Sequence, residues 1–134
     1  MNETVKEWMV KAEDDYRVAV REFEADPKPS FDAACFHAQQ CVEKLMKAVL
    51  IQHSVLAPRT HDLLVLSHLL TTVETGWVWS ETELESLNRA AVNYRYPGET
   101  AARDDAAAAV DRAGRLSEAL RRLIEPEPSD GGSP

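Results

Sequence analysis

The sequence predicts an all-α fold of about five helices in a single domain. Apolar residues recur at intervals of three and four along most of the chain, which is the period of one face of a helix. The breaks between these stretches fall at proline or glycine, and no stretch alternates apolar and polar residues with a period of two. We therefore expect helices and no sheet.

The first helix is expected from Thr4 to Phe23. Its apolar face consists of Val5, Trp8, Met9, Ala12, Tyr16, Ala19, Val20 and Phe23. The segment 26–29 contains two prolines, which lack the amide donor that a continuing helix needs. A turn is therefore expected there.

The second helix is expected from a cap at Ser30 to about His53. Its main apolar face consists of Phe31, Ala34, Cys35, Ala38, Val42, Leu45, Met46 and Val49. A second line of residues follows the opposite side at helical spacing, namely Phe36, Gln40, Lys44, Lys47 and Ile51. Because this second line mixes apolar and polar groups, we expect the helix to have neighbours on both sides.

Two shorter helices are expected next. Thr60 or Asp62 can cap the third, which runs to a turn at Gly76. Ser80 and Glu83 have the spacing of a capping box at the start of the fourth.

The segment 94–98, which contains proline and glycine, is expected to end the fourth helix. Thr100 is expected to open a fifth helix, which ends before Pro126. Residues 1–124 are expected to form the helical domain, and residues 125–134 a disordered acidic tail.

Composition limits the classes of partner. The chain has 134 residues, and 15 Lys and Arg against 23 Asp and Glu give a net charge of −8, which opposes non-specific attraction to nucleic acid or to an anionic membrane. No apolar run approaches the roughly 20 residues of a membrane span, and the first residues lack a basic segment followed by an apolar block. We expect a cytoplasmic protein without a membrane partner.

The common catalytic and cofactor motifs are missing from the sequence. The four histidines do not have the spacing of a metal site, and Cys35 and Cys41 are interpreted as core thiols. There is no Gly-x-Ser-x-Gly, no phosphate-binding GxxxxGK[ST] and no GxGxxG. We therefore expect neither a metal nor a cofactor.

Six cations could form a local anion site. Four lie around the expected helix ends, namely Arg59, Arg89, Arg95 and Arg103, and Lys44 and Lys47 lie on the second face of the second helix. The alternative is that they lie on solvated faces or pair with neighbouring acids such as Glu43, Glu99 and Asp104.

Three stretches carry a resemblance to a known family. Residues 36–50 read FHAQQCVEKLMKAVL, residues 60–63 read THDL, and residues 95–97 read RYP. Over about residues 4–124, the chain resembles the HEPN domain. The resemblance implies an up-and-down bundle of five helices, usually a homodimer, associated with nucleotide or RNA substrates and with minimal nucleotidyltransferase partners. Many members of the family are ribonuclease toxins.

The ribonuclease members carry an arginine followed, after four to six intervening residues, by a histidine. That spacing is absent here, since the corresponding positions after Arg95 are Thr100, Ala101 and Ala102. No residue is therefore assigned a catalytic role, and the resemblance points to a non-nucleolytic binding module, plausible as half of a toxin–antitoxin pair.

Two alternatives stay open. One is a ribonuclease in which the fold brings His61 or His37 to Arg95, and the other is a structural dimer without a ligand.

The candidate ligand-binding residues are Arg95, Tyr96, Lys44 and Lys47, and the candidate dimer interface is Phe36, Gln40 and Ile51. Tyrosines beside Arg95 could stack on a base while the guanidinium binds a phosphate. Alternatively, Arg95 ties its loop to Glu99 or Asp104.

Overall fold

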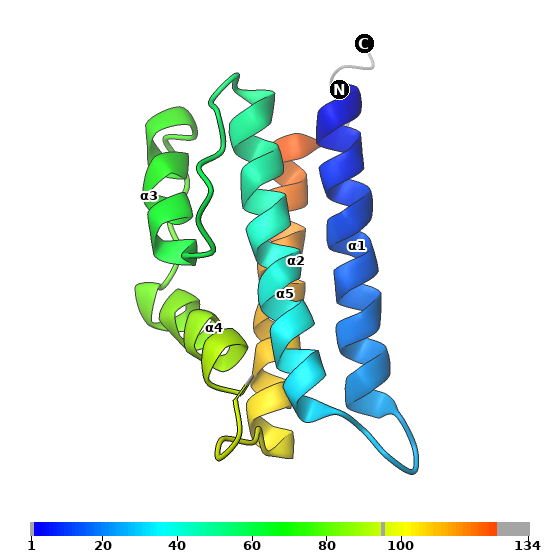
Figure 1. The fold of residues 1–134 in the computed structure, drawn as a ribbon. Coiled ribbons are helices and arrows are strands. Elements are labelled where there is room, and N and C mark those ends of the chain that lie inside the picture. The colour runs from blue at the N-terminus through cyan, green and yellow to red at the C-terminus, as the bar shows by residue number, and fades with distance from the viewer. Residues whose placement is uncertain (1, 95, 126–134) are drawn as a thin grey trace.

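The fold is organised around one central helix. The computed structural model describes residues 2–94 and 96–125, and these form five helices and no strand. The helices are α1 (Glu3–Glu24), α2 (Phe31–Gln52), α3 (Leu63–Val73), α4 (Glu81–Asn93) and α5 (Arg103–Ile124). The long helices α1, α2 and α5 run side by side, and the short helices α3 and α4 lie on the other side of α2 (Figure 1). The predicted all-α fold is confirmed.

Helix α2 contacts each of the other four helices. Its side chains Leu45, Met46 and Leu50 are fully buried in the middle of the core. Full burial of a side chain of this size stabilises the fold by roughly 1.5–3 kcal/mol. The expectation that this helix has neighbours on both sides is confirmed, because α1 and α5 cover one side and α3 and α4 the other.

Polar side chains cap the first four helices. Asn2, Ser30, Asp62 and Ser80 each accept a hydrogen bond from a backbone N–H in the first turn of their helix. Of the two caps considered for the third helix, Asp62 is the one used, and it accepts from the N–H of Leu64 at 2.9 Å.

Two details at the helix starts differ from the sequence prediction. Helix α5 is not opened by Thr100: it begins at Arg103 after the N-cap Ala102, whose backbone N–H donates to Asp105 at 2.8 Å. Only one half of the capping box of α4 forms. Ser80 accepts from the N–H of Glu83, whereas the Glu83 carboxylate accepts from Trp79 and from Arg115.

No helix of the described chain is both long and apolar enough to cross a bilayer. The predicted tail falls largely outside the described residues, since they end at Glu125.

Candidate binding site between α2 and α4

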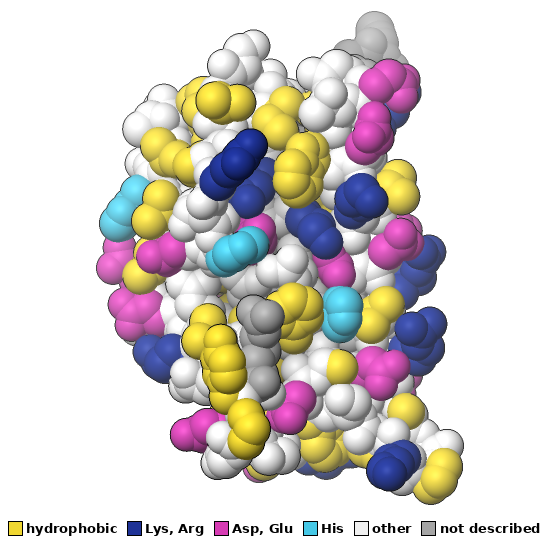
Figure 2. All heavy atoms as spheres, viewed as in Figure 1, with side chains coloured by type: hydrophobic (Ala, Val, Ile, Leu, Met, Phe, Trp, Pro, Cys, Tyr) yellow, Lys and Arg dark blue, Asp and Glu magenta, His cyan; other side chains and the backbone are white. Residues whose placement is uncertain are grey.

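A surface pocket of about 550 Å³ lies where α2, α4 and the connection between α2 and α3 meet. Its polar wall consists of Gln39, Gln40, His61, Asp62 and Asn88. Its apolar wall consists of Phe36, Ala91 and Val92. Figure 2 shows this side of the molecule with hydrophobic, basic, acidic and histidine side chains interspersed. The pocket is therefore mixed in character and does not sit in a field of one charge sign.

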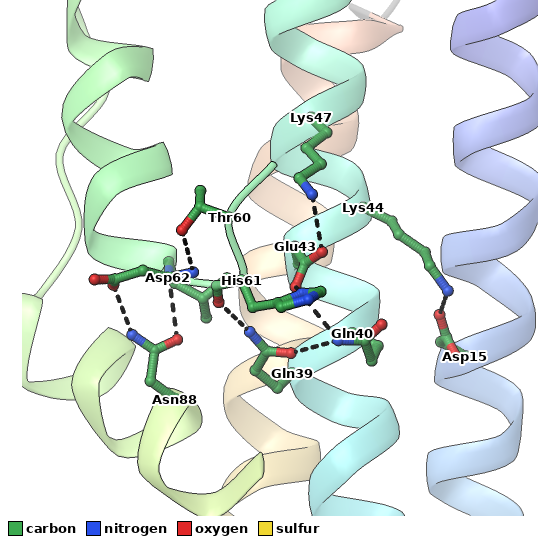
Figure 3. Close-up of polar contacts among 11 residues, drawn as sticks. Asp15, Gln39, Gln40, Glu43, Lys44, Lys47, Thr60, His61, Asp62 and Asn88 are labelled. Carbon is green, nitrogen blue, oxygen red and sulfur yellow. Dashed lines mark hydrogen bonds and ion pairs between the residues drawn. The ribbon is translucent and has the colours of Figure 1, made fainter. Parts of the chain in front are cut away.

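Beneath the pocket, the buried carboxylate of Glu43 joins three other side chains (Figure 3). It is only 3% exposed, and it accepts hydrogen bonds from Lys47 at 3.0 Å, His61 at 2.9 Å and Gln40 at 3.3 Å. A buried carboxylate is tolerated only when it is paired in this way. An ionised carboxylate can only accept, so Nδ1 of His61 donates to it, and in the neutral form of the imidazole Nε2 then carries the lone pair.

A second buried carboxylate has the same kind of partners. Asp15 of α1 is 7% exposed, and it accepts from Nδ1 of His37 at 2.8 Å and from Lys44 at 2.5 Å. Each of the two buried acids is therefore paired with one lysine and one histidine. The contacts of Asp15 join α1 to α2, and the contact of Glu43 with His61 joins α2 to the connection that follows it.

The connection between α2 and α3 is clamped at its end. Gln39 donates to the backbone carbonyl of His61 at 2.8 Å, and the backbone N–H of Leu63 donates to Asn88 of α4 at 3.1 Å. Asn88 in turn donates to Asp62 at 2.9 Å. These contacts hold the polar wall of the pocket in one geometry before any ligand arrives (Figure 3).

The predicted interface residues are only partly at this pocket. Phe36 and Gln40 line it, and both are half-buried. Ile51 is half-buried as well, but it packs against the core.

Lys44, Lys47 and Tyr96, the predicted ligand-binding residues that the structure describes, do not line the pocket. The ammonium groups of Lys44 and Lys47 are turned to Asp15 and Glu43, and Lys47 also lies 5.8 Å from the centre of the Trp8 ring. Pairing with a neighbouring acid, the alternative considered from sequence, is therefore what the structure has for Lys47. Tyr96 is 60% exposed, and Arg95 lies outside the described residues.

Sequence reasoning assigned no site role to Glu43, Gln39, Asp62 or Asn88. A signal existed for the first, since Gln40, Glu43 and Lys47 follow one another at spacings of three and four on one helix face. Nothing in the sequence connects Asn88 to that group, because its contact with Asp62 depends on how α4 packs against the start of α3.

The two cysteines are buried and free, as predicted for core thiols. Burial raises the pKa of the Cys35 thiol to about 12 and that of the Cys41 thiol to about 11. Among the described residues, no group of three or more His, Cys, Asp and Glu side chains is placed to hold a metal ion.

Comparisons with known proteins agree with this architecture. The model of the HEPN domain matches residues 5–123. The crystal structure of TT1696 from Thermus thermophilus is similar with a TM-score of 0.70 and 21% identity, over 89% of this chain and 97% of that chain. The crystal structure of ST0689, an archaeal HEPN homologue, is similar with a TM-score of 0.64 and 22% identity, over 90% of this chain and 98% of that chain. No curated protein matches the chain significantly. At these identities, the two structures establish the fold alone.

Proposed function

The chain belongs to the HEPN domain family, and from that premise we propose that it is a non-nucleolytic binding module. It acts as a homodimer that engages a nucleotide or a minimal nucleotidyltransferase, in the manner of a toxin–antitoxin pair. Residues 5–123 carry the family match, so the proposed activity belongs to the helical bundle itself.

One observation carries this proposal: the pocket between α2 and α4 is already built. Its polar wall is held by Glu43 and Asn88, and Phe36 and Val92 give it an apolar side. Mixed walls with a few fixed polar groups are typical of ligand and partner sites. A site fixed in advance loses little conformational entropy on binding, which favours affinity.

The proposal that RNA is not cleaved is supported by the sequence spacing of the histidines. His61 and His37 are the two that a rearranged site could use, and the pairing of each with a buried carboxylate is compatible with either function. Neither has the sequence spacing from an arginine that the ribonuclease members use.

Calorimetric titration with nucleotides, and capture of a purified minimal nucleotidyltransferase, test the binding function. We expect saturable binding in at least one of the two assays. No binding in either assay would contradict the proposal and would favour a structural dimer without a ligand.

A ribonuclease remains a second candidate because of the pair formed by His61 and Glu43. A carboxylate that fixes one ring nitrogen leaves the other poised as a general base, and His61 is 83% exposed in its side chain. Incubation with RNA in the absence of metal distinguishes the two functions. Cleavage that is lost in both Arg95→Ala and His61→Gln would establish the ribonuclease and overturn the non-nucleolytic module.

A further inference from the structure

The polar wall of the pocket offers acceptors rather than donors. Gln40 donates through its amide nitrogen to Gln39 and to Glu43, which leaves its Oε1 without a partner among the described residues. In the neutral form of His61, Nδ1 donates to Glu43 and Nε2 keeps a lone pair that has no partner among the residues that the structure describes. The open atoms of both side chains can therefore accept a hydrogen bond from a ligand.

Asp62 adds a negative charge to these acceptors. Its Oδ1 accepts from Leu64 and from Asn88, but the carboxylate has no ion pair with any described cation. The positive end of α3 offsets part of this charge, as at any capped helix start. Oδ2 accepts from no residue within 2–94 and 96–125, so it is open to a donor from a ligand.

The two lysines of α2 are already paired with acids. Lys44 is paired with Asp15, and Lys47 is paired with Glu43. No lysine or arginine is among the described residues that line the pocket. A phosphate placed there would therefore meet a carboxylate and lone pairs, with no cation of the described wall to bind it.

We propose that this pocket receives the guanidinium group of an arginine side chain presented by a basic partner protein. The inference rests on the proposed binding function and specifies the chemistry of the partner. Asp62, Gln40 and His61 would accept from the guanidinium, whose several N–H groups suit more than one acceptor at once. The methylene stem would lie along Ala91 and Val92, in a pocket of about 550 Å³.

The overall charge favours a different protein over the other occupants. At −8, the chain attracts a basic protein over long range. A second copy would bring the same charge and the same acceptors to the pocket. Of the two occupants named in the proposed function, a nucleotide would bring its phosphates to a wall that has no described cation, so this pocket favours the protein partner.

The experiment titrates the isotope-labelled full chain with N-acetyl-arginine amide and follows the side-chain signals of Gln40, His61 and Asn88 by NMR. The citrulline analogue, which has almost the same shape and no charge, is the matched ligand. We expect saturable shifts with the arginine compound, and at least about tenfold weaker binding of the citrulline compound.

Asp62→Asn is the decisive variant. Asparagine caps a helix as well as aspartate does, and its carbonyl can still accept from Leu64 and Asn88, so the change removes the charge and keeps the fold. Binding of the arginine compound should fall at least about tenfold. Asp104→Asn is the matched control, since this exposed carboxylate lines a different pocket, and it should leave binding unchanged.

The outcomes separate this inference from the proposed function. Absence of saturable shifts, equal binding of the citrulline compound, or insensitivity to Asp62→Asn would overturn the arginine site. So would tighter binding to Arg95→Ala, which would show that the chain's own Arg95 competes for the pocket. A nucleotide or nucleotidyltransferase that binds wild type and Asp62→Asn equally well would contradict this inference and would still support the proposed function. Failure of both of those partners, with the arginine compound still bound, would contradict the proposed function instead.

Discussion

At the scale of single residues, the two buried carboxylates are both paired with neighbouring side chains. Glu43 and Asp15 each accept from a lysine and a histidine, and no buried side-chain nitrogen or oxygen of the described residues lacks a partner. Breaking such a pair would leave a charge without a partner in the core, which costs roughly 3–5 kcal/mol. Lys44 and Lys47 are therefore held in ion pairs that stabilise the fold, and binding a ligand would require these pairs to break.

The thiols of Cys35 and Cys41 should be unreactive in the folded protein. Burial raises their pKa values to about 12 and about 11 from a usual 9.0, so almost no thiolate exists at pH 8. A thiol-specific reagent such as dithiobisnitrobenzoate should label neither residue at pH 8, and both after unfolding in urea. Rapid labelling of the folded protein would contradict the buried placement.

The same pKa values predict a loss of stability in alkali. Above pH 9 the unfolded chain gives up its thiol protons while the folded chain keeps them, so unfolding is favoured as the pH rises. The free energy of unfolding should fall by up to about 1.4 kcal/mol per pH unit and thiol between pH 9 and the folded values. Replacing both cysteines by alanine should flatten this part of the profile in urea titrations at several pH values.

At the scale of the helices, sequence periodicity correctly predicted the positions that are buried because their side chains are apolar. The stripe of α1 gave Val5, Met9, Ala12 and Ala19 correctly as buried positions. It could not identify Asp15 as buried, because burying a carboxylate makes sense only with Lys44 and His37 of α2 beside it.

The same limit applies to the candidate site. Gln40 and Phe36, which share a helix face, were predicted for a dimer interface and line the pocket, whereas Asp62 and Asn88 were missed. Their contact joins two elements whose relative position no local pattern encodes. Local sequence patterns therefore predict the helices, but they do not predict the site, which depends on how the helices pack against one another.

The contact between α1 and α5 depends on a glycine. A Cβ built on Gly114 would lie 2.9 Å from the hydroxyl oxygen of Tyr16 and 3.7 Å from its Cζ. Alanine in a helix interior is otherwise favoured over glycine by about 1 kcal/mol. Gly114→Ala should therefore gain little or lose stability, because the tyrosine hydroxyl must move aside.

In the Tyr16→Phe background, the same substitution should stabilise the protein by about 1 kcal/mol, since only an ordinary contact remains. Urea unfolding of the four proteins in this cycle measures the difference. Equal effects of Gly114→Ala in the two backgrounds would rule out the steric explanation.

At the scale of the whole molecule, Phe36 and Ile51 of α2 are half-buried, and we expect a second copy to pack against this apolar side, beside the polar wall of the pocket and without filling it. Light scattering at micromolar concentration should give twice the chain mass of 15.0 kDa. Phe36→Glu should weaken the dimer because it would bury an unpaired carboxylate.

Val78→Glu is the matched control for that variant, since Val78 is 82% exposed and lies in the connection between α3 and α4. It should leave the mass of the dimer unchanged. A wild-type mass near that of one chain would show that the face of α2 needs no second copy.

The central position of α2 also determines how the pocket can open. Its side chains Gln39 and Gln40 belong to the helix that every other helix packs against. A local fluctuation that freed them would have to dismantle the core, so backbone amides around residues 39–43 should exchange with solvent only through global unfolding. Any molecule that occupies the pocket would then be coupled to the stability of the entire bundle, and its affinity would appear as a rise in melting temperature.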